Sequence, residues 1–192
     1  MANKIKYGLK NVYYAVATIA ADNSATYETP VALPGAVSLS MDPQGENSPF
    51  YADNIVYYMG ASNTGYEGDL ELARLPDSFK TDVLGYIESG NGLLVEDANA
   101  QPVHFALMFQ FEGDVKATRH VLYNCTATRA TAAGNTKSET VEPETESVTI
   151  TATSIYLEAL GTDIVKADTN DTTTDTVYNG WFSAVTVPTV KT

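Results

Sequence analysis

Residues 102–125 read PVHFALMFQFEGDVKATRHVLYNC, and this stretch decides the fold class. In its first half, one set of alternate positions holds Val103, Phe105, Leu107, Phe109 and Phe111, and the other set holds His104, Ala106, Met108 and Gln110. Alternation with a period of two predicts a half-buried β-strand. The turn-prone Glu112-Gly113-Asp114 follows, and extended character resumes at residues 120–125, so the pair is predicted to be an antiparallel hairpin.

Similar patterns lie on both sides of this hairpin. Further strands are expected at residues 11–20, 36–41, 55–59, 66–72 and 148–156. A Leu33-Pro34-Gly35 turn precedes the second of them. Pro143, with glutamates at every second position around it, favours an edge strand at residues 141–146. The sequence therefore predicts a mainly β protein.

One helix interrupts the strands, at residues 76–89. Pro76 suits a first helical turn, Phe79, Val83, Tyr86 and Ile87 recur at helical spacing, and Gly90 suits a left-handed cap. Residues 167–176 (ADTNDTTTDT) are acidic and of low complexity, which predicts an exposed loop or insertion. Trp181, the single tryptophan, is expected to anchor the carboxyl-terminal segment.

Composition limits the possible functions. A length of 192 residues with 44% hydrophobic residues fits one domain over residues 1–192. The net charge of −13 disfavours binding to nucleic acid phosphates or anionic lipid surfaces. Apolar runs are too short to cross a bilayer and no signal sequence is recognisable, so synthesis in the cytoplasm is expected. Cys125 is expected to be a buried side chain.

Catalytic and metal-binding motifs are weak. His104 and His120 lack nearby ligands at metal-binding spacing, and residues 168–179 lack the glycine and the glutamate of a calcium loop. No phosphate-binding glycine loop, nucleophile elbow or Cys/His dyad is present. We therefore expect no enzyme activity, no cofactor and no metal.

Two surface features call for an explanation. Residues 42–54 are polar and loop-like but carry Phe50 and Tyr51 at the centre, which implies either a binding partner or a loop folded back on its own domain. On the strand at residues 66–72, Glu67, Asp69 and Glu71 share one face. Three carboxylates so close together repel one another, so this face is expected to contact water.

Seven segments, taken in order, resemble one protein family. They are NVYYAV (11–16), LPGAVSLS (33–40), FYADN (50–54), GYEGDLELARLPDSF (65–79), FALMFQFEGD (105–114), RHVLYNC (119–125) and TKSETVEPETESVTITAT (136–153). Together they resemble the major tail proteins of long-tailed bacteriophages, in the phi13-type branch. Residues 167–176 do not match that pattern.

The resemblance implies a tail-tube protomer: a β-sandwich or barrel-like fold with one flanking helix and extended loop or terminal arms. Six copies would close into a ring, and stacked rings would enclose the channel through which phage DNA is delivered. It implies contacts with other copies, with the tape measure protein, and with terminator or adaptor proteins, but no specific DNA binding and no membrane. Residues 42–54, with Phe50, Tyr51 and Asp53, would contact the next ring.

In the same view, Glu67, Asp69 and Glu71 would line the channel wall or, alternatively, face the tube exterior. Two other classes of protein fit the residues. A non-catalytic all-β module that binds carbohydrate or a receptor would also be acidic and rich in aromatic residues. A hydrolase with dispersed carboxylates is the third possibility.

Overall fold

The computed structural model describes residues 3–132, 134, 136 and 144–190. The chain is mainly β, as predicted, with two short helices among the described residues. The elements are β1 (Lys6–Ile19), β2 (Ala25–Tyr27), β3 (Val31–Ala32), β4 (Ala36–Gln44), β5 (Asn47–Ala52), β6 (Ile55–Ala61), β7 (Gly65–Leu72), α1 (Asp77–Asp82), β8 (Ile87–Glu88), β9 (Leu94–Val95), β10 (Phe105–Gly113), β11 (Thr118–Ala127), β12 (Glu146–Thr153), β13 (Ile155–Leu157), β14 (Thr162–Ile164), β15 (Lys166–Asp168) and α2 (Asp175–Gly180).

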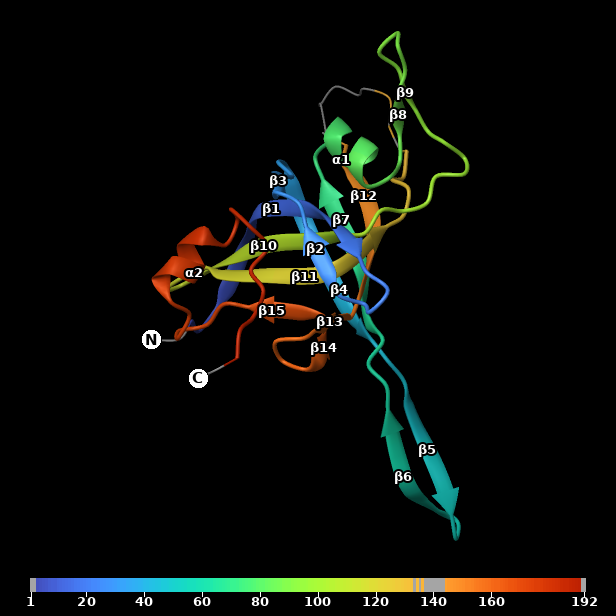
Figure 1. Cartoon of the computed structure of the whole chain (residues 1–192), viewed down its shortest axis with the longest axis vertical. Helices are drawn as coiled ribbons and strands as arrows, with labels where there is room; N and C mark the ends of the chain where they lie inside the picture. Colours follow the sequence, from blue (N-terminus) through green and yellow to red (C-terminus); the bar gives the residue numbers. More distant parts are fainter. Residues whose placement is uncertain (1–2, 133, 135, 137–143, 191–192) are drawn as a thin grey trace.

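The main sheet is antiparallel and has the order β2-β1-β10-β11-β12-β7-β4, with β3 paired to β1 and β15 paired to β11 (Figure 1). The predicted central hairpin is confirmed as β10 and β11, in which Phe109 lies opposite His120. The path ends at β2 on one side and at β4 on the other. The sheet is therefore open and does not close into a barrel.

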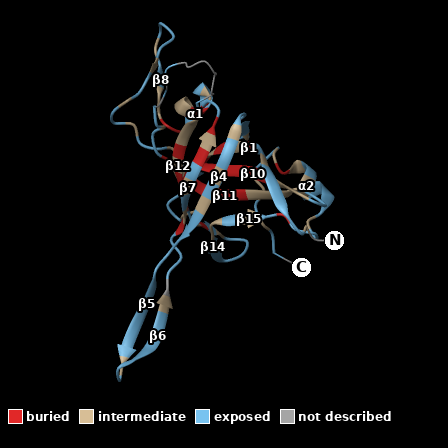
Figure 2. Cartoon of the chain, turned by 180° about the vertical axis from the view of Figure 1, so that it is seen from behind, coloured by how far each residue is buried: buried red, intermediate tan, exposed pale blue. Residues whose placement is uncertain are grey.

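Strand β10 is buried on both faces, and the prediction of a half-buried strand is wrong. Phe105 and Leu107 belong to the larger core, which also includes Phe79 of α1. Ala106 and Met108 point the other way, into a second core that includes Trp181. Figure 2 shows the buried residues gathered on these central strands. The alternation seen in the sequence separates two cores rather than core from solvent.

Helix α1 ends at Asp82 and not near residue 89. Gly85 has φ = 73°, a left-handed conformation that glycine adopts readily, and the chain turns there. Phe79 and Val83 are buried as expected, but Ile87 lies beyond the turn in β8 and is exposed. The helical spacing of Tyr86 and Ile87 was coincidental, and Gly85, not Gly90, has the left-handed conformation at the end of the helical segment.

Residues 167–176 are not a single loop or an insertion. They comprise the end of β15, a turn and the first residues of α2, a helix that the sequence pattern did not predict. Thr169 is buried, and its hydroxyl accepts a hydrogen bond from the Arg119 amide at 2.9 Å. Thr174 is the N-cap of α2 and accepts from the Val177 amide at 3.5 Å. The polar side chains of this segment therefore form the hydrogen bonds of the turn and of the helix cap.

The carboxyl-terminal segment covers the second face of the sheet. The Arg119 guanidinium lies 3.8 Å from the centre of the Tyr178 ring and donates to the Tyr178 carbonyl. Trp181 is buried, as predicted, and its indole nitrogen donates to the His120 carbonyl at 3.4 Å. Tyr123 donates to the Thr186 carbonyl at 2.9 Å. Contact of a terminal arm with another copy of the chain stays a prediction.

Half of the edge strand expected at residues 141–146 lies outside the described part of the chain, since residues 141–143 are not described. Strand β12 begins at Glu146, and the Glu146 carboxylate accepts a hydrogen bond from the Leu75 amide at 2.7 Å. This contact fixes the start of β12 beside the segment that leads into α1.

Candidate assembly surfaces

A long hairpin, β5 and β6, projects away from the sheet (Figure 1). Its turn is the two-residue loop Asp53-Asn54, in which both residues have positive φ, 51° and 60°. Such a turn matches the right-handed twist of the paired strands. At the base, the Ser62 amide donates to the Glu46 carbonyl at 3.0 Å, and the Thr64 amide donates to the Gln44 carbonyl at 2.9 Å. These bonds join the hairpin to the β4–β7 pair.

Both strands of the hairpin expose apolar side chains. Phe50 and Tyr51 are 60% and 63% exposed. The exposed set on the hairpin is Phe50, Tyr51, Ile55, Val56, Tyr57, Tyr58 and Met59. An exposed apolar surface of this extent marks an interaction site, because a soluble monomer seldom leaves so many large side chains in water. Figure 2 shows the hairpin exposed along its length.

The prediction of a loop at residues 42–54 is wrong. They are the end of β4, all of β5 and the turn, rather than a loop, and they are not folded back on their own domain. Residues 55–59, expected as an ordinary strand, complete the same apolar surface as β6. Residues 55–59 (IVYYM) do not alternate with polar residues, and this pattern could have indicated that β6 is apolar on both sides. The contact of Phe50, Tyr51 and Asp53 with another ring stays a prediction.

The second candidate surface lies on the solvent side of β4, β7 and β12. Glu67, Asp69 and Glu71 project from β7, and their register partners on both neighbouring strands are polar. The nine residues of this carboxylate face are Ser38, Ser40, Asp42, Glu67, Asp69, Glu71, Ser147, Thr149 and Thr151. None of the nine is lysine or arginine, so the face is anionic and rich in hydroxyl groups.

Hydroxyl groups hold two of these carboxylates in place. Thr145 and Ser38 donate to the two oxygens of Glu71 at 2.5 and 2.7 Å, and Thr149 donates to Asp69 at 2.7 Å. The hydrogen bonds from Thr145 and Ser38 lower the pKa of Glu71. Glu71 therefore stays charged at neutral pH. The carboxylate face contacts solvent, as expected, and its role as a channel wall stays a prediction.

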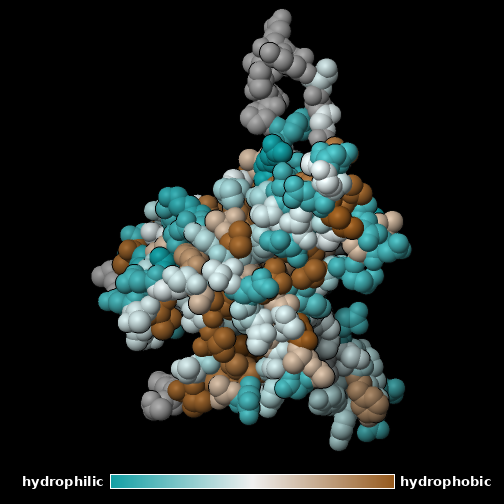
Figure 3. Space-filling view, turned by 45° about the horizontal axis from the view of Figure 1, so that its top comes forward, coloured by the Kyte–Doolittle hydropathy of each residue, from teal (hydrophilic) through white to brown (hydrophobic). Residues whose placement is uncertain are grey.

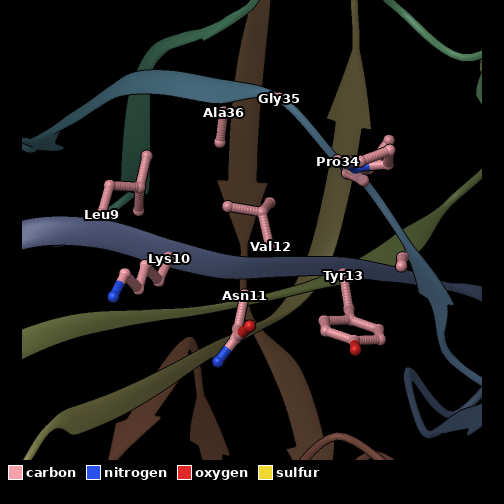
Figure 4. A pocket seen from close by; sticks show the side chains of 10 residues that line it. Leu9, Lys10, Asn11, Val12, Tyr13, Pro34, Gly35 and Ala36 are labelled. Carbon is pink, nitrogen blue, oxygen red and sulfur yellow. The ribbon is translucent and has the colours of Figure 1, made fainter.

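A third feature is a groove of about 330 Å³ between β1 and the β3–β4 segment (Figure 4). Leu9 and Val12 both point into it, although they are three positions apart in one strand. A bulge permits this, because Asn11 has φ = 51° and the β1–β10 register shifts between Lys10 and Tyr13. The lining is mostly apolar and offers no acid–base pair, so the groove gives no sign of catalysis.

The remaining reactive groups have structural roles. A ring nitrogen of His104 lies 2.7 Å from the amide oxygen of Asn124, and His120 stacks on Phe109. Burial lowers the pKa of His120 and raises the pKa of the Cys125 thiol to about 12. Within the described residues, no group of three or more His, Cys, Asp or Glu could hold a metal ion.

An open antiparallel sheet with a projecting apolar hairpin and an anionic face is typical of a structural protein. A family model described as phage tail tube protein matches residues 2–183. The chain belongs to this family and is a structural component of the phage tail. No curated protein matches the sequence. No described helix is long and apolar enough to cross a membrane.

Proposed function

We propose that this chain is the protomer of the tail tube: six copies close into a ring, and rings stack into a hollow tube that delivers phage DNA. The observation that carries the proposal is the β5–β6 hairpin, which extends beyond its own domain and exposes an apolar surface. Membership of the phage tail tube family supports it. In this arrangement Phe50, Tyr51 and Asp53 contact the next ring.

The hairpin has the properties of an interface element. Burial of apolar surface contributes about 25 cal/mol per Å², and aromatic residues dominate the energetics of most interfaces. No element of the described chain covers Phe50 or Tyr58, so a partner must supply the covering surface. Repetition of one such contact along an axis produces a filament.

The carboxylate face suits the wall of a DNA channel. DNA carries one phosphate charge per roughly 1.7 Å of helix axis, and each lysine or arginine that contacted a phosphate would add a binding term in every ring. Glu67, Asp69 and Glu71, with hydroxyl neighbours on both sides, repel the polyanion instead. DNA then passes without being held. The exterior of the tube is the alternative location for this face.

The proposal implies partners at the ends and inside the tube. The last ring leaves its hairpins or their binding surfaces uncovered, so a terminator or adaptor protein is needed at each end. A tape measure protein would occupy the channel before DNA enters. No cofactor and no membrane takes part in this function.

Negative-stain electron microscopy of concentrated purified protein tests the proposal. Rings or hollow tubes support it, particularly if they form above a threshold concentration. Small separate particles at all concentrations would instead favour a non-catalytic binding module, whose exposed aromatic side chains would stack on a carbohydrate or dock on a receptor.

A further inference from the structure

A second exposed apolar surface lies at the end of the molecule opposite the β5–β6 hairpin. It belongs to the short ribbon β8–β9, residues 87–95 (Figure 1). Ile87, Leu93 and Val95 are 55%, 59% and 47% exposed. None of the roles that the family resemblance implies involves this surface, and it is separate from the carboxylate face.

The three side chains share one face of the ribbon. Ile87 lies directly opposite Val95 in the register. Leu93 comes just before β9, two positions before Val95, and the two-residue alternation of an extended chain favours the same side for both. Glu88 and Leu94 lie on the other side and line a groove beside α1, and Leu93, next to the turn of the ribbon, also borders this groove. We call Ile87, Leu93 and Val95 the ribbon face.

Local hydrogen bonds hold the ribbon in shape. The Ser89 amide donates to the Leu93 carbonyl at 2.8 Å, and the Leu93 amide donates to the Ser89 hydroxyl at 3.0 Å. Below the ribbon, Tyr86 donates to Glu96 at 3.1 Å, and Glu96 pairs with Arg129 at 2.8 Å. The apolar side chains are therefore presented by an ordered ribbon that is tied to the domain.

We propose that the ribbon face is the surface on which the β5–β6 hairpin of a copy in the next ring docks. This inference rests on the proposed tube function and assigns the acceptor of its axial contact. The hairpin and the ribbon lie at opposite ends of the longest axis of the chain, as Figure 1 shows. Two different patches at opposite ends give a head-to-tail contact, which continues indefinitely along an axis.

Charge supports a second copy as the occupant. Two chains with a net charge of −13 repel each other, so a contact between them is best placed where carboxylates are scarce. Residues 47–61 of the hairpin carry one charged side chain, Asp53. Residues 87–95 also carry one, Glu88, and it points away from the ribbon face. The two patches can therefore meet with little repulsion.

The chemistry of the two patches also matches. The hairpin presents aromatic rings, and the ribbon face presents aliphatic side chains of similar exposure. Arg74 lines the adjacent groove together with Lys80, Asp77 and Glu88, and in this proposal it meets the Asp53 carboxylate at the hairpin turn. Figure 3 shows hydrophobic clusters separated by hydrophilic surface on the face in view.

Thiol-specific cross-linking tests the acceptor directly, because the single native cysteine is buried and raises no background. Tyr58→Cys and Leu93→Cys proteins are mixed, assembled and treated with a short bismaleimide. A third protein, Leu160→Cys, is the control, since Leu160 is exposed but distant from the ribbon in sequence. We expect covalent dimers from the Tyr58→Cys and Leu93→Cys mixture and at least about tenfold fewer from Tyr58→Cys with Leu160→Cys.

The outcomes separate the two proposals. Tubes that form without preferential Tyr58→Cys to Leu93→Cys linkage overturn the acceptor assignment and leave the tube function standing. Failure of the wild-type protein to form tubes overturns both. As a second measurement, the triple variant Ile87→Ser, Leu93→Ser and Val95→Ser should keep the wild-type thermal unfolding midpoint but raise the concentration needed for tubes at least about tenfold. An unchanged threshold would also overturn the assignment.

Discussion

The hydroxyl of Tyr14 on β1 donates a hydrogen bond to Asp82 at the end of α1 across 2.7 Å. The Tyr14 ring packs edge-on against Phe79, with ring centres 5.1 Å apart, and Phe79 packs edge-on against Phe105 at 5.6 Å. A six-residue helix is too short to be stable alone, so these contacts hold α1 on the sheet. The contacts also fix the position from which the chain continues into the β8–β9 ribbon.

Replacing Phe79 by alanine should destabilise the monomer by about 3–5 kcal/mol, because the ring is fully buried between Tyr14 and Phe105. Urea unfolding of the unassembled protein measures this. Ile87→Ala is the matched control: the sequence placed Ile87 on the same helical face, but it is exposed and should change stability by no more than about 0.5 kcal/mol. Equal effects of the two variants would contradict the packing described.

Stability should fall at alkaline pH through Tyr14. Burial raises the pKa of Tyr14 to about 12, and Asp82 acts in the same direction, whereas an unfolded tyrosine titrates near ~10. The folded state therefore binds the Tyr14 proton more tightly than the unfolded state does. The resulting contribution to the free energy of unfolding is complete below about pH 10 and is lost as pH rises toward about 12. Tyr14→Phe should reduce the pH dependence of the free energy of unfolding in this range.

The Cys125 thiol should not react with a thiol reagent in the native protein. It is fully buried, and burial raises its pKa to about 12, so little thiolate is available at neutral pH. Labelling with a chromogenic disulfide at pH 8 should become complete only after unfolding in denaturant. Rapid labelling of the native protein would show that the core around β11 opens locally.

The double variant Phe50→Ser and Tyr51→Ser should fold normally but fail to form tubes. Both rings are exposed in the single chain, so their loss costs the monomer little, whereas loss of an aromatic anchor typically costs an interface about 2 kcal/mol or more. Circular dichroism checks the fold and electron microscopy checks assembly. Leu160→Ser removes an exposed apolar side chain elsewhere and serves as control. Normal tubes from the double variant would exclude the hairpin from the axial contact.

Replacing Glu67, Asp69 and Glu71 by lysine should leave tubes intact and slow or block genome delivery, because each ring would then attract DNA phosphates. Infectivity of phage that carry the variant is the measurement. The neutral set Glu67→Gln, Asp69→Asn and Glu71→Gln keeps similar side-chain shapes and should deliver DNA more efficiently than the lysine set. Normal infectivity with the lysine set would place this face outside the channel.

Much of the fold could be predicted from local patterns. Alternation along residues 103–111 and 120–125 identified the central hairpin, and the face shared by Glu67, Asp69 and Glu71 followed from the two-residue period of a strand. The turn at Gly35, with φ = 85°, followed from the Pro-Gly pair. These features depend on neighbouring residues, so the sequence by itself determined them.

Only the tertiary structure decided which surfaces are covered. The carboxyl-terminal segment buries the second face of β10, although its polar residues 167–176 are typical of a loop. Ile87 resembles a core residue of a helix in the sequence, yet it is exposed on the β8–β9 ribbon, and Phe50 is exposed on the β5–β6 hairpin instead of folding back on its own domain. Burial depends on contacts between segments far apart in the chain, whereas periodicity reports only which residues share a side of one element.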